Sequence, residues 1–174
     1  MTTWKIDSAH SHIQFKVKHL VVSTVTGEFT KYDATIDTSK DDFSDARINF
    51  EADIDSVNTG NEQRDGHLKS DDFFNAASFP KMKFVSKEIK KLDTEHYKLT
   101  GDLTLRDKTL PVTLDAVYGG TIKDAYGRTV AGIEVSGKIN RKEYGLKWHM
   151  TTEAGGIVVS DDVKIEISAE LIKQ

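Results

Sequence analysis

Apolar residues recur at every second position near the start of the chain, where Ile13, Phe15 and Val17 alternate with polar residues such as Lys16 and Lys18. A two-residue period is typical of a strand with one buried face, because successive side chains of a strand point to opposite sides of the sheet. We therefore predict a half-buried strand here, and not a helix.

The same period returns along the rest of the chain, and a weaker strand is expected around residues 29–36. The chain is thus expected to hold about eight strands. The further alternating stretches are 48–54, 82–84, 97–105, 110–118, 131–139 and 163–171.

Short connections predict that neighbouring strands are antiparallel. Residues 106–109 link two alternating stretches directly, and residues 124–127 end in a glycine that favours a tight reversal. Both connections are predicted to be hairpin turns, since the crossover between two parallel strands needs more residues. Strands with one apolar face must either stack as two sheets or close into a barrel, and the pattern leaves both arrangements open.

One segment breaks the strand pattern. Thr59 and Glu62 have the spacing of a capping box, and no alternation follows through residues 63–67, so we expect a short helix there. Ser70 then offers a second cap before the adjacent Phe73 and Phe74, which cannot both face the same way on a strand. This segment is expected to pack over one end of the sheet.

Small residues interrupt the inward-facing apolar positions. Small side chains inside an eight-stranded barrel can leave room for a ligand, or they can taper the core and relieve crowding between strands. Spacing alone leaves both interpretations open. The residues are Ala52, Gly101, Ala116, Ala131, Gly137 and Ala169.

Composition narrows the functional classes. The 174 residues fit one domain over 1–174, and the absence of cysteine excludes disulfides and thiolate chemistry. The net charge is −4 with the signs interleaved, which argues against nucleic-acid binding. The start, MTTWKIDSAH, lacks the features of a signal peptide and no stretch is long enough to span a bilayer, so we expect a cytoplasmic protein, or a periplasmic one if a signal peptide was removed.

Candidate chemistry is sparse. His10 and His12 share a strand face whereas His19 has the opposite parity, so the three cannot form one cluster without a bulge and no metal site is predicted. Ser11 lies beside His10 without a nucleophile-elbow motif, and no glycine-rich phosphate loop is present. We expect no catalytic residues, no enzymatic activity and no nucleotide cofactor.

Several separated motifs resemble the YceI family, in the expected order and over essentially the whole chain. They are Trp4-x-Ile6-Asp7-x-x-His10-Ser11-x-Ile13-x-Phe15-x-Val17-x-His19, Gly27-x-Phe29, Arg64-Asp65-x-x-Leu68-Lys69-Ser70-x-x-Phe73-Phe74, Phe79-Pro80-x-x-x-Phe84, Gly101-x-Leu103-Thr104-Leu105, Arg141-Lys142-Glu143-Tyr144-Gly145 and Val159-Ser160-Asp161-x-Val163-x-Ile165.

The resemblance implies an all-β fold, a lipocalin-like eight-stranded antiparallel β-barrel with one or two short helices between strands. It also implies a bacterial homodimer that carries or stores a long-chain lipid in an apolar interior, commonly a polyisoprenoid such as an isoprenoid quinone or polyprenyl pyrophosphate, or a fatty-acid-type lipid. The alternative is a stress-related protein-interaction domain whose barrel is filled by its own side chains. Two features of this chain depart from the family. Many members are exported, whereas this sequence begins without the features of a signal peptide, and Arg106-Asp107-Lys108 replaces a turn that often contains glycine.

Alternation and the resemblance together give candidate site residues. Phe73 and Phe74 are expected to form a lid, and a polar head group would need cationic partners at the mouth, for which we name Arg64, His67, Lys69 and Arg141. For His10, Ser11 and His19 we expect a buried hydrogen-bonding link between a strand and the neighbouring loop. The predicted lipid-contacting residues are Ile13, Phe15, Val17, His19, Phe50, Phe73, Phe74, Phe84, Leu99, Leu103 and Val135.

Overall fold

The alternating stretches form antiparallel strands in the computed structural model, which describes residues 1–20, 22–149 and 159–174. The helices are α1 (Glu62–Lys69) and the single-turn 3-10 helices η1 (Ser8–His10), η2 (Ile54–Ser56) and η3 (Arg141–Tyr144). The strands are β1 (Thr2–Ile6), β2 (His12–His19), β3 (Ser23–Phe29), β4 (Tyr32–Thr38), β5 (Arg47–Asp53), β6 (Val57–Asn58), β7 (Lys81–Lys91), β8 (His96–Leu105), β9 (Lys108–Lys123), β10 (Thr129–Asn140) and β11 (Val159–Lys173).

These segments make eight strands, because three strands are interrupted. The first consists of β1 and β2 on either side of η1, the second of β3 and β4, and the third of β5 and β6 on either side of η2. Within each adjacent pair the two halves keep the same partner: β1 pairs with β4 and β2 with β3, while β5 pairs with β4 and β6 with β3.

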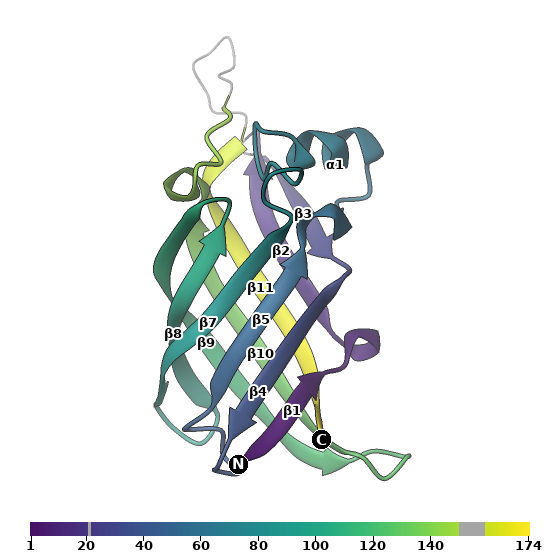
Figure 1. Cartoon of the computed structure of the whole chain (residues 1–174), viewed down its shortest axis with the longest axis vertical. Coiled ribbons are helices and arrows are strands. Elements are labelled where there is room, and N and C mark those ends of the chain that lie inside the picture. The colour runs from purple at the N-terminus through teal and green to yellow at the C-terminus, as the bar shows by residue number, and fades with distance from the viewer. Residues whose placement is uncertain (21, 150–158) are drawn as a thin grey trace.

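The eight strands close into a barrel. Each strand is antiparallel to its neighbours in chain order, and the first and last strands join through the pairs Trp4 with Lys173 and Ile13 with Ile167. Closure removes the exposed edges that two stacked sheets would leave. The predicted eight-stranded antiparallel barrel is therefore confirmed (Figure 1).

Both predicted hairpins are present. Arg106 and Asp107 alone connect β8 to β9, and Arg106 takes the left-handed backbone conformation at φ = 53° that a two-residue turn requires of its first residue. In the second hairpin Gly127 has φ = 79°, and the Asp124 carboxylate accepts hydrogen bonds from the backbone amides of Tyr126 and Arg128.

The predicted helix is present as α1, but its expected cap is wrong. Asn61 is the N-cap, and its side-chain oxygen accepts a hydrogen bond of 3.0 Å from the Arg64 amide. Thr59 instead donates its hydroxyl to the Asp65 carboxylate at 2.6 Å. Residues 71–74 form turns and no helix, so Ser70 does not cap a second one. No helix among the described residues is long and apolar enough to cross a membrane.

The two ends of the barrel differ. Helix α1 lies across one end, whereas both termini lie at the other (Figure 1). Buried side chains fill the end of the barrel that holds the two termini. There, the ring centroids of Trp4 and Phe43 are 5.1 Å apart, and Ala131 and Leu171 are at most 2 % exposed. This cluster forms a floor that closes the barrel.

Candidate functional site

The barrel encloses a cavity of about 340 Å³. This volume lies within the range of about 300–1,000 Å³ that is typical of small-molecule pockets. Thirty-seven described residues line the cavity, and all but six of them are apolar. The lining is therefore suited to a hydrophobic guest.

The inward side chains of β11 show that the barrel is hollow. Val163, Ile165 and Ile167 lie in the middle of the strand and stay partly accessible because they face the cavity, whereas Leu171 near the floor is 2 % exposed. A barrel filled by its own side chains would bury the middle of each strand as deeply as its end.

The cavity brings together the residues that alternation places on the inner face. Each of the eleven predicted lipid-contacting residues borders it, although contact with lipid itself stays a prediction. They are Ile13, Phe15, Val17, His19, Phe50, Phe73, Phe74, Phe84, Leu99, Leu103 and Val135.

Two of the small inward residues make room for neighbouring side chains, as the second of the two interpretations drawn from the sequence expects. A side chain at Gly101 would collide with the Phe84 ring, and one at Gly137 would collide with Leu114. These glycines therefore make room for neighbouring large side chains. Of the six small residues named above, Ala169 alone belongs to the described cavity lining. The interior of an eight-stranded barrel is wide enough to hold one small ligand.

Aromatic side chains gather at the α1 end of the cavity. Phe74 meets Phe29 edge-on with ring centroids 5.9 Å apart, and Phe73 lies 5.5 Å from Trp148. His67 packs edge-on against both Phe73 and Trp148 at 5.1 and 5.0 Å. Phe73 and Phe74 both reach the cavity because a turn, and not a strand, carries them.

Arg106 holds this aromatic segment in place. Its guanidinium donates hydrogen bonds to the backbone carbonyls of Asp71 and Phe73 at 2.7 and 2.9 Å, pairs with the Asp71 carboxylate at 3.0 Å, and stacks on the Phe79 ring. The departure from a glycine-containing turn therefore has a structural role. The turn residue itself supplies the anchor.

Three of the four predicted head-group residues border the cavity, namely Arg64, His67 and Arg141, whereas Lys69 is outside its described lining. Arg141 is 3 % exposed, and it donates hydrogen bonds to the backbone carbonyls of Leu146 at 2.6 Å and Ser160 at 2.9 Å. Burial lowers the pKa of its guanidinium. The cation stays charged all the same, because an arginine pKa lies far above neutral.

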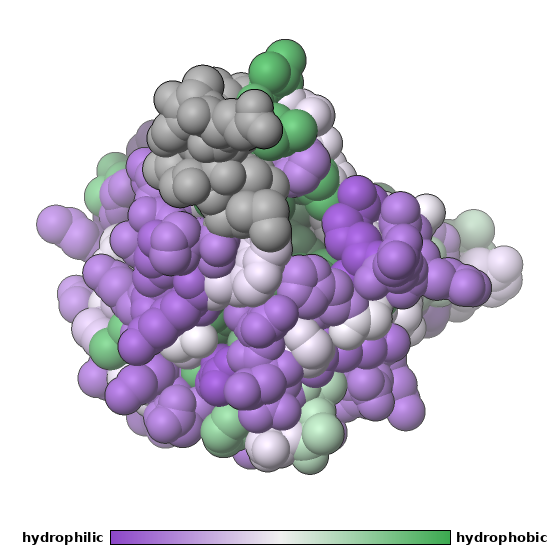
Figure 2. All heavy atoms as spheres, turned by 90° about the horizontal axis from the view of Figure 1, so that it is seen from above, coloured by the Kyte–Doolittle hydropathy of each residue, from purple (hydrophilic) through white to green (hydrophobic). Residues whose placement is uncertain are grey.

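End-on, most of the surface around α1 is hydrophilic, with hydrophobic residues reaching the surface beside the grey atoms (Figure 2). The polar members of the cavity lining come from β2, α1 and the start of η3. They are Gln14, Lys18, His19, Arg64, His67 and Arg141.

The expected buried link is made by Ser11 alone. Ser11 is 4 % exposed, and its hydroxyl accepts a hydrogen bond of 3.0 Å from the Glu170 amide, which ties the kink after η1 to β11. His10 is exposed and binds Asp7, and His19 borders the cavity, so the prediction is wrong for both. A kink turns His10 out of the strand face on which alternation had placed it.

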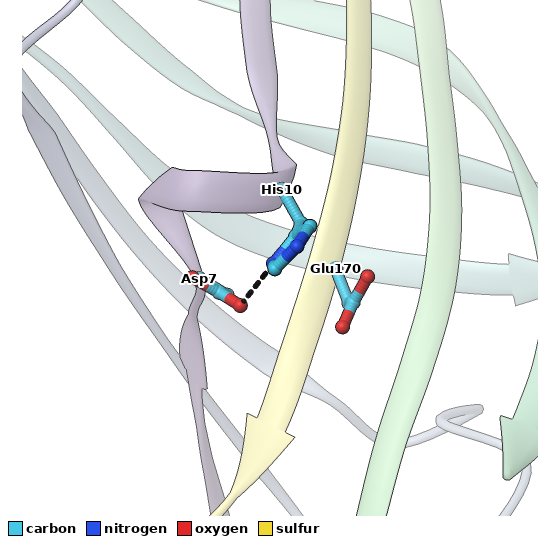
Figure 3. A group of neighbouring side chains, drawn as sticks. All are labelled: Asp7, His10 and Glu170. Carbon is cyan, nitrogen blue, oxygen red and sulfur yellow. Dashed lines mark hydrogen bonds and ion pairs between the residues drawn. The ribbon is translucent and has the colours of Figure 1, made fainter. Parts of the chain in front are cut away.

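Asp7, His10 and Glu170 form a cluster on the outside of the barrel (Figure 3). Their potential metal-ligating atoms lie within 4.8 Å of one another. The Asp7 carboxylate caps η1 through the Ala9 amide and is 2.8 Å from Nδ1 of His10. Asp7 and Glu170 also lie in the electrostatic field of Arg128. We therefore assign the cluster to the stability of the kink.

The Asp7–His10 pair is expected to make stability pH-dependent. Its hydrogen bond raises the pKa of His10 and lowers that of Asp7. The contribution of His10 to folding stability is complete below its unfolded-state pKa of about 6.5, and it disappears as pH rises through its higher folded-state pKa. The contribution of Asp7 to folding stability is complete above its unfolded-state pKa of about 3.9, and it disappears as pH falls through its lower folded-state pKa. The difference in Tm between wild type and His10→Gln should therefore shrink between roughly pH 6 and pH 8.5, the range over which His10 loses its proton.

Asp7→Asn supplies the control, because asparagine still caps η1 but carries no charge. In that background, His10→Gln should change Tm by a pH-independent amount. A pH-dependent change that persisted there would assign the effect to Glu170 instead.

The sequence identifies the family to which this barrel belongs. A model of the YceI-like domain matches residues 4–171. The chain belongs to the YceI-like family. The resemblance seen in the separated motifs is thereby confirmed.

Relatives and solved structures agree with this assignment. A UPF0312 protein of Staphylococcus aureus strain USA300 is 40% identical to this YceI-like protein over 171 residues, which cover 98% of this chain and 97% of the relative. The YceI protein of Campylobacter jejuni superposes with a TM-score of 0.78 at 36% identity, over 90% of each chain. A polyisoprenoid binding domain from Saccharophagus degradans, implicated in plant cell wall breakdown, shares the fold with a TM-score of 0.69 at 17% identity over 98% of each chain.

Sequence reasoning missed part of the lining. Some of the lining residues that were not predicted are strand residues, such as Val112, Ile139 and Ile165, and they lie in stretches that do show the two-residue alternation. Leu146 and Trp148 follow η3 in a segment without periodicity, so no sequence signal identified them.

Proposed function

We propose that this YceI-like protein binds one long-chain apolar lipid inside the barrel, as a carrier or reservoir and without catalysing a reaction on it. The observation that carries the proposal is the apolar cavity of about 340 Å³ in the middle of the barrel. The family assignment and the fold shared with a polyisoprenoid binding domain support an isoprenoid as the lipid class.

The physical reason is that a long hydrocarbon chain gains from a dry environment more than from specific polar contacts. Each buried CH₂ contributes about 0.8 kcal/mol. The cavity lining offers side chains such as Phe15, Leu103 and Val135, which give apolar contact without hydrogen-bonding groups. We expect a flexible chain to fill this space in place of water.

The lipid is expected to enter with its tail first. The floor of the barrel is packed by Trp4 and its neighbours, whereas the polar lining residues Arg64, His67 and Arg141 lie on or beside the elements at the α1 end. The tail would then lie toward Leu171 and the polar head toward α1. The predicted homodimer and the cellular compartment stay predictions beside this proposal.

Native mass spectrometry of freshly purified protein tests the proposal directly. We expect a mass above that of the polypeptide, and organic extraction should release a polyprenyl or other long-chain lipid. Geranylgeraniol and palmitic acid, added to delipidated protein, should each give a one-to-one adduct. A bare polypeptide that takes up neither compound would contradict the proposal and favour a surface function.

A further inference from the structure

We propose that the turn between β2 and β3, represented by Leu20 and Val22, docks the protein on a lipid bilayer and brings the α1 end of the cavity to the membrane surface. This inference rests on the proposed lipid-binding function and names the partner that supplies and receives the lipid. A long-chain lipid is too apolar to be present in water as more than traces, so contact with a bilayer is the efficient way to load the barrel.

The β2–β3 turn lies at the end of the barrel opposite the floor. β11 begins at Val159 and reaches the floor at Leu171, and His19 pairs with Val159, so the residues that follow His19 lie at the α1 end (Figure 1). Lys18, His19 and Val25, which flank the turn, all border the cavity. A lipid can therefore keep its polar end at the membrane surface while its tail moves into the barrel toward the floor.

Both residues of the turn present apolar surface to solvent. Val22 is 85 % exposed and Leu20 is 44 % exposed. Seen end-on, hydrophobic residues reach the surface at this end of the molecule (Figure 2). Neither Leu20 nor Val22 belongs to the described core or to the described cavity lining. Their position beside a lipid-binding cavity favours a bilayer as the partner, because apolar side chains gain free energy when they leave water for its interface.

The backbone at Leu20 supports a functional role for its side chain. Leu20 has φ = 53°, in the left-handed region where a side chain with a β-carbon is disfavoured and where glycine and asparagine are the usual residues. A leucine at this position costs backbone strain in addition to solvent exposure. The described core gains no contact from it in return, and such uncompensated local costs are typical of functional positions.

The charges around the turn are compatible with insertion into a bilayer. Residues 13–27 include no aspartate or glutamate, and an acidic side chain is costly to place in a membrane. The nearby carboxylates of Asp161 and Asp162, at the start of β11, form salt bridges with lysines. Lys18 is exposed, and its long side chain can keep the ammonium at the polar surface while the methylene groups lie among apolar ones.

Co-sedimentation with large phosphatidylcholine vesicles tests the docking surface. The double variant Leu20→Asn with Val22→Ser should partition onto the vesicles at least about tenfold less than the wild type, the effect of losing two apolar side chains from the interface. Asparagine suits the left-handed conformation, so the Tm of Leu20→Asn should equal or exceed that of the wild type. Ile122→Ser is the matched control and should bind vesicles normally, because Ile122 is exposed but its partner Val130 pairs with Ile172 at the floor end.

Transfer of a pyrene-labelled fatty acid between donor and acceptor vesicles tests what docking does. For the wild type we expect a transfer rate that rises with the concentration of acceptor vesicles, because the lipid changes place during contact. The double variant should transfer the probe at least about tenfold more slowly. It should still form a one-to-one adduct with the probe in native mass spectrometry, since the substitutions lie outside the described cavity lining.

The outcomes separate the docking surface from the proposed function. Equal vesicle binding by the wild type and the double variant, or an equal loss in Ile122→Ser, would overturn the docking surface and leave lipid binding intact. A wild-type transfer rate independent of the acceptor concentration would do the same. Wild-type protein that forms no adduct with the probe in native mass spectrometry would overturn the proposed function itself.

Discussion

Replacing Ile165 by tryptophan is expected to abolish the binding of a long-chain lipid while the barrel still folds. Ile165 lies in the middle of β11, paired with Phe15 on one side and Gly137 on the other, and its side chain borders the cavity. The larger indole extends into open space, so its cost in overpacking should stay within about 1–3 kcal/mol. The lost space removes many buried CH₂ groups, each contributing about 0.8 kcal/mol, so affinity should fall by well over tenfold.

Lys164→Trp is the matched control, because Lys164 is exposed on the outer face of the same strand. Native mass spectrometry and displacement of a fluorescent lipid should show binding in Lys164→Trp and little in Ile165→Trp, with both variants retaining cooperative unfolding. Equal lipid binding by the two variants would place the lipid outside the barrel.

The strands and their inner faces could be predicted because a period of two has a direct geometric meaning. Alternation assigned Phe15, Leu103 and Val135 to the same side of three strands, and closure of the barrel brings these sides together. No long-range information was needed for this step. Closure itself needed either the resemblance or the structure, since sandwich and barrel share the same pattern.

The interruptions of the first three strands are encoded in the sequence as a change of parity between inward-facing residues. Ile6 and Ile13 both border the cavity, yet they are an odd number of positions apart, which no continuous strand allows. The same change of parity separates Phe29 from Ala34, which also both border the cavity. A change of parity between inward residues therefore marks a kink such as η1.

The contacts made by loops could not be predicted in this way. Arg106 reads locally as a turn residue, but its hydrogen bonds are made to the carbonyls of Asp71 and Phe73, more than thirty residues earlier. Trp148 likewise reaches His67 only because the barrel brings η3 and α1 to the same end. Such contacts depend on tertiary structure, for which a single sequence carries no periodic signal.

Trp4→Ala is expected to lower the free energy of unfolding by about 3–5 kcal/mol, the usual cost of removing a large buried aromatic side chain. Trp4 is 6 % exposed and packs against Phe43 in the floor of the barrel, outside the described cavity lining. Since typical domains are stable by about 5–15 kcal/mol, this loss is a large part of the total. Urea denaturation followed by circular dichroism measures it.

Trp4→Phe separates packing from hydrogen bonding at the same site. The indole Nε1 is buried and has no hydrogen-bond partner among the described residues, so phenylalanine loses volume but no hydrogen bond. Its cost should stay below about 1.5 kcal/mol, as for other moderate changes of shape in a core. A loss as large as that of Trp4→Ala would show that the indole N–H is bound in solution, for example by a buried water. Because the floor keeps most of its packing in Trp4→Phe, this variant should bind lipid as the wild type does. Ile165→Trp should show the opposite behaviour, since it fills the cavity and does not alter the floor.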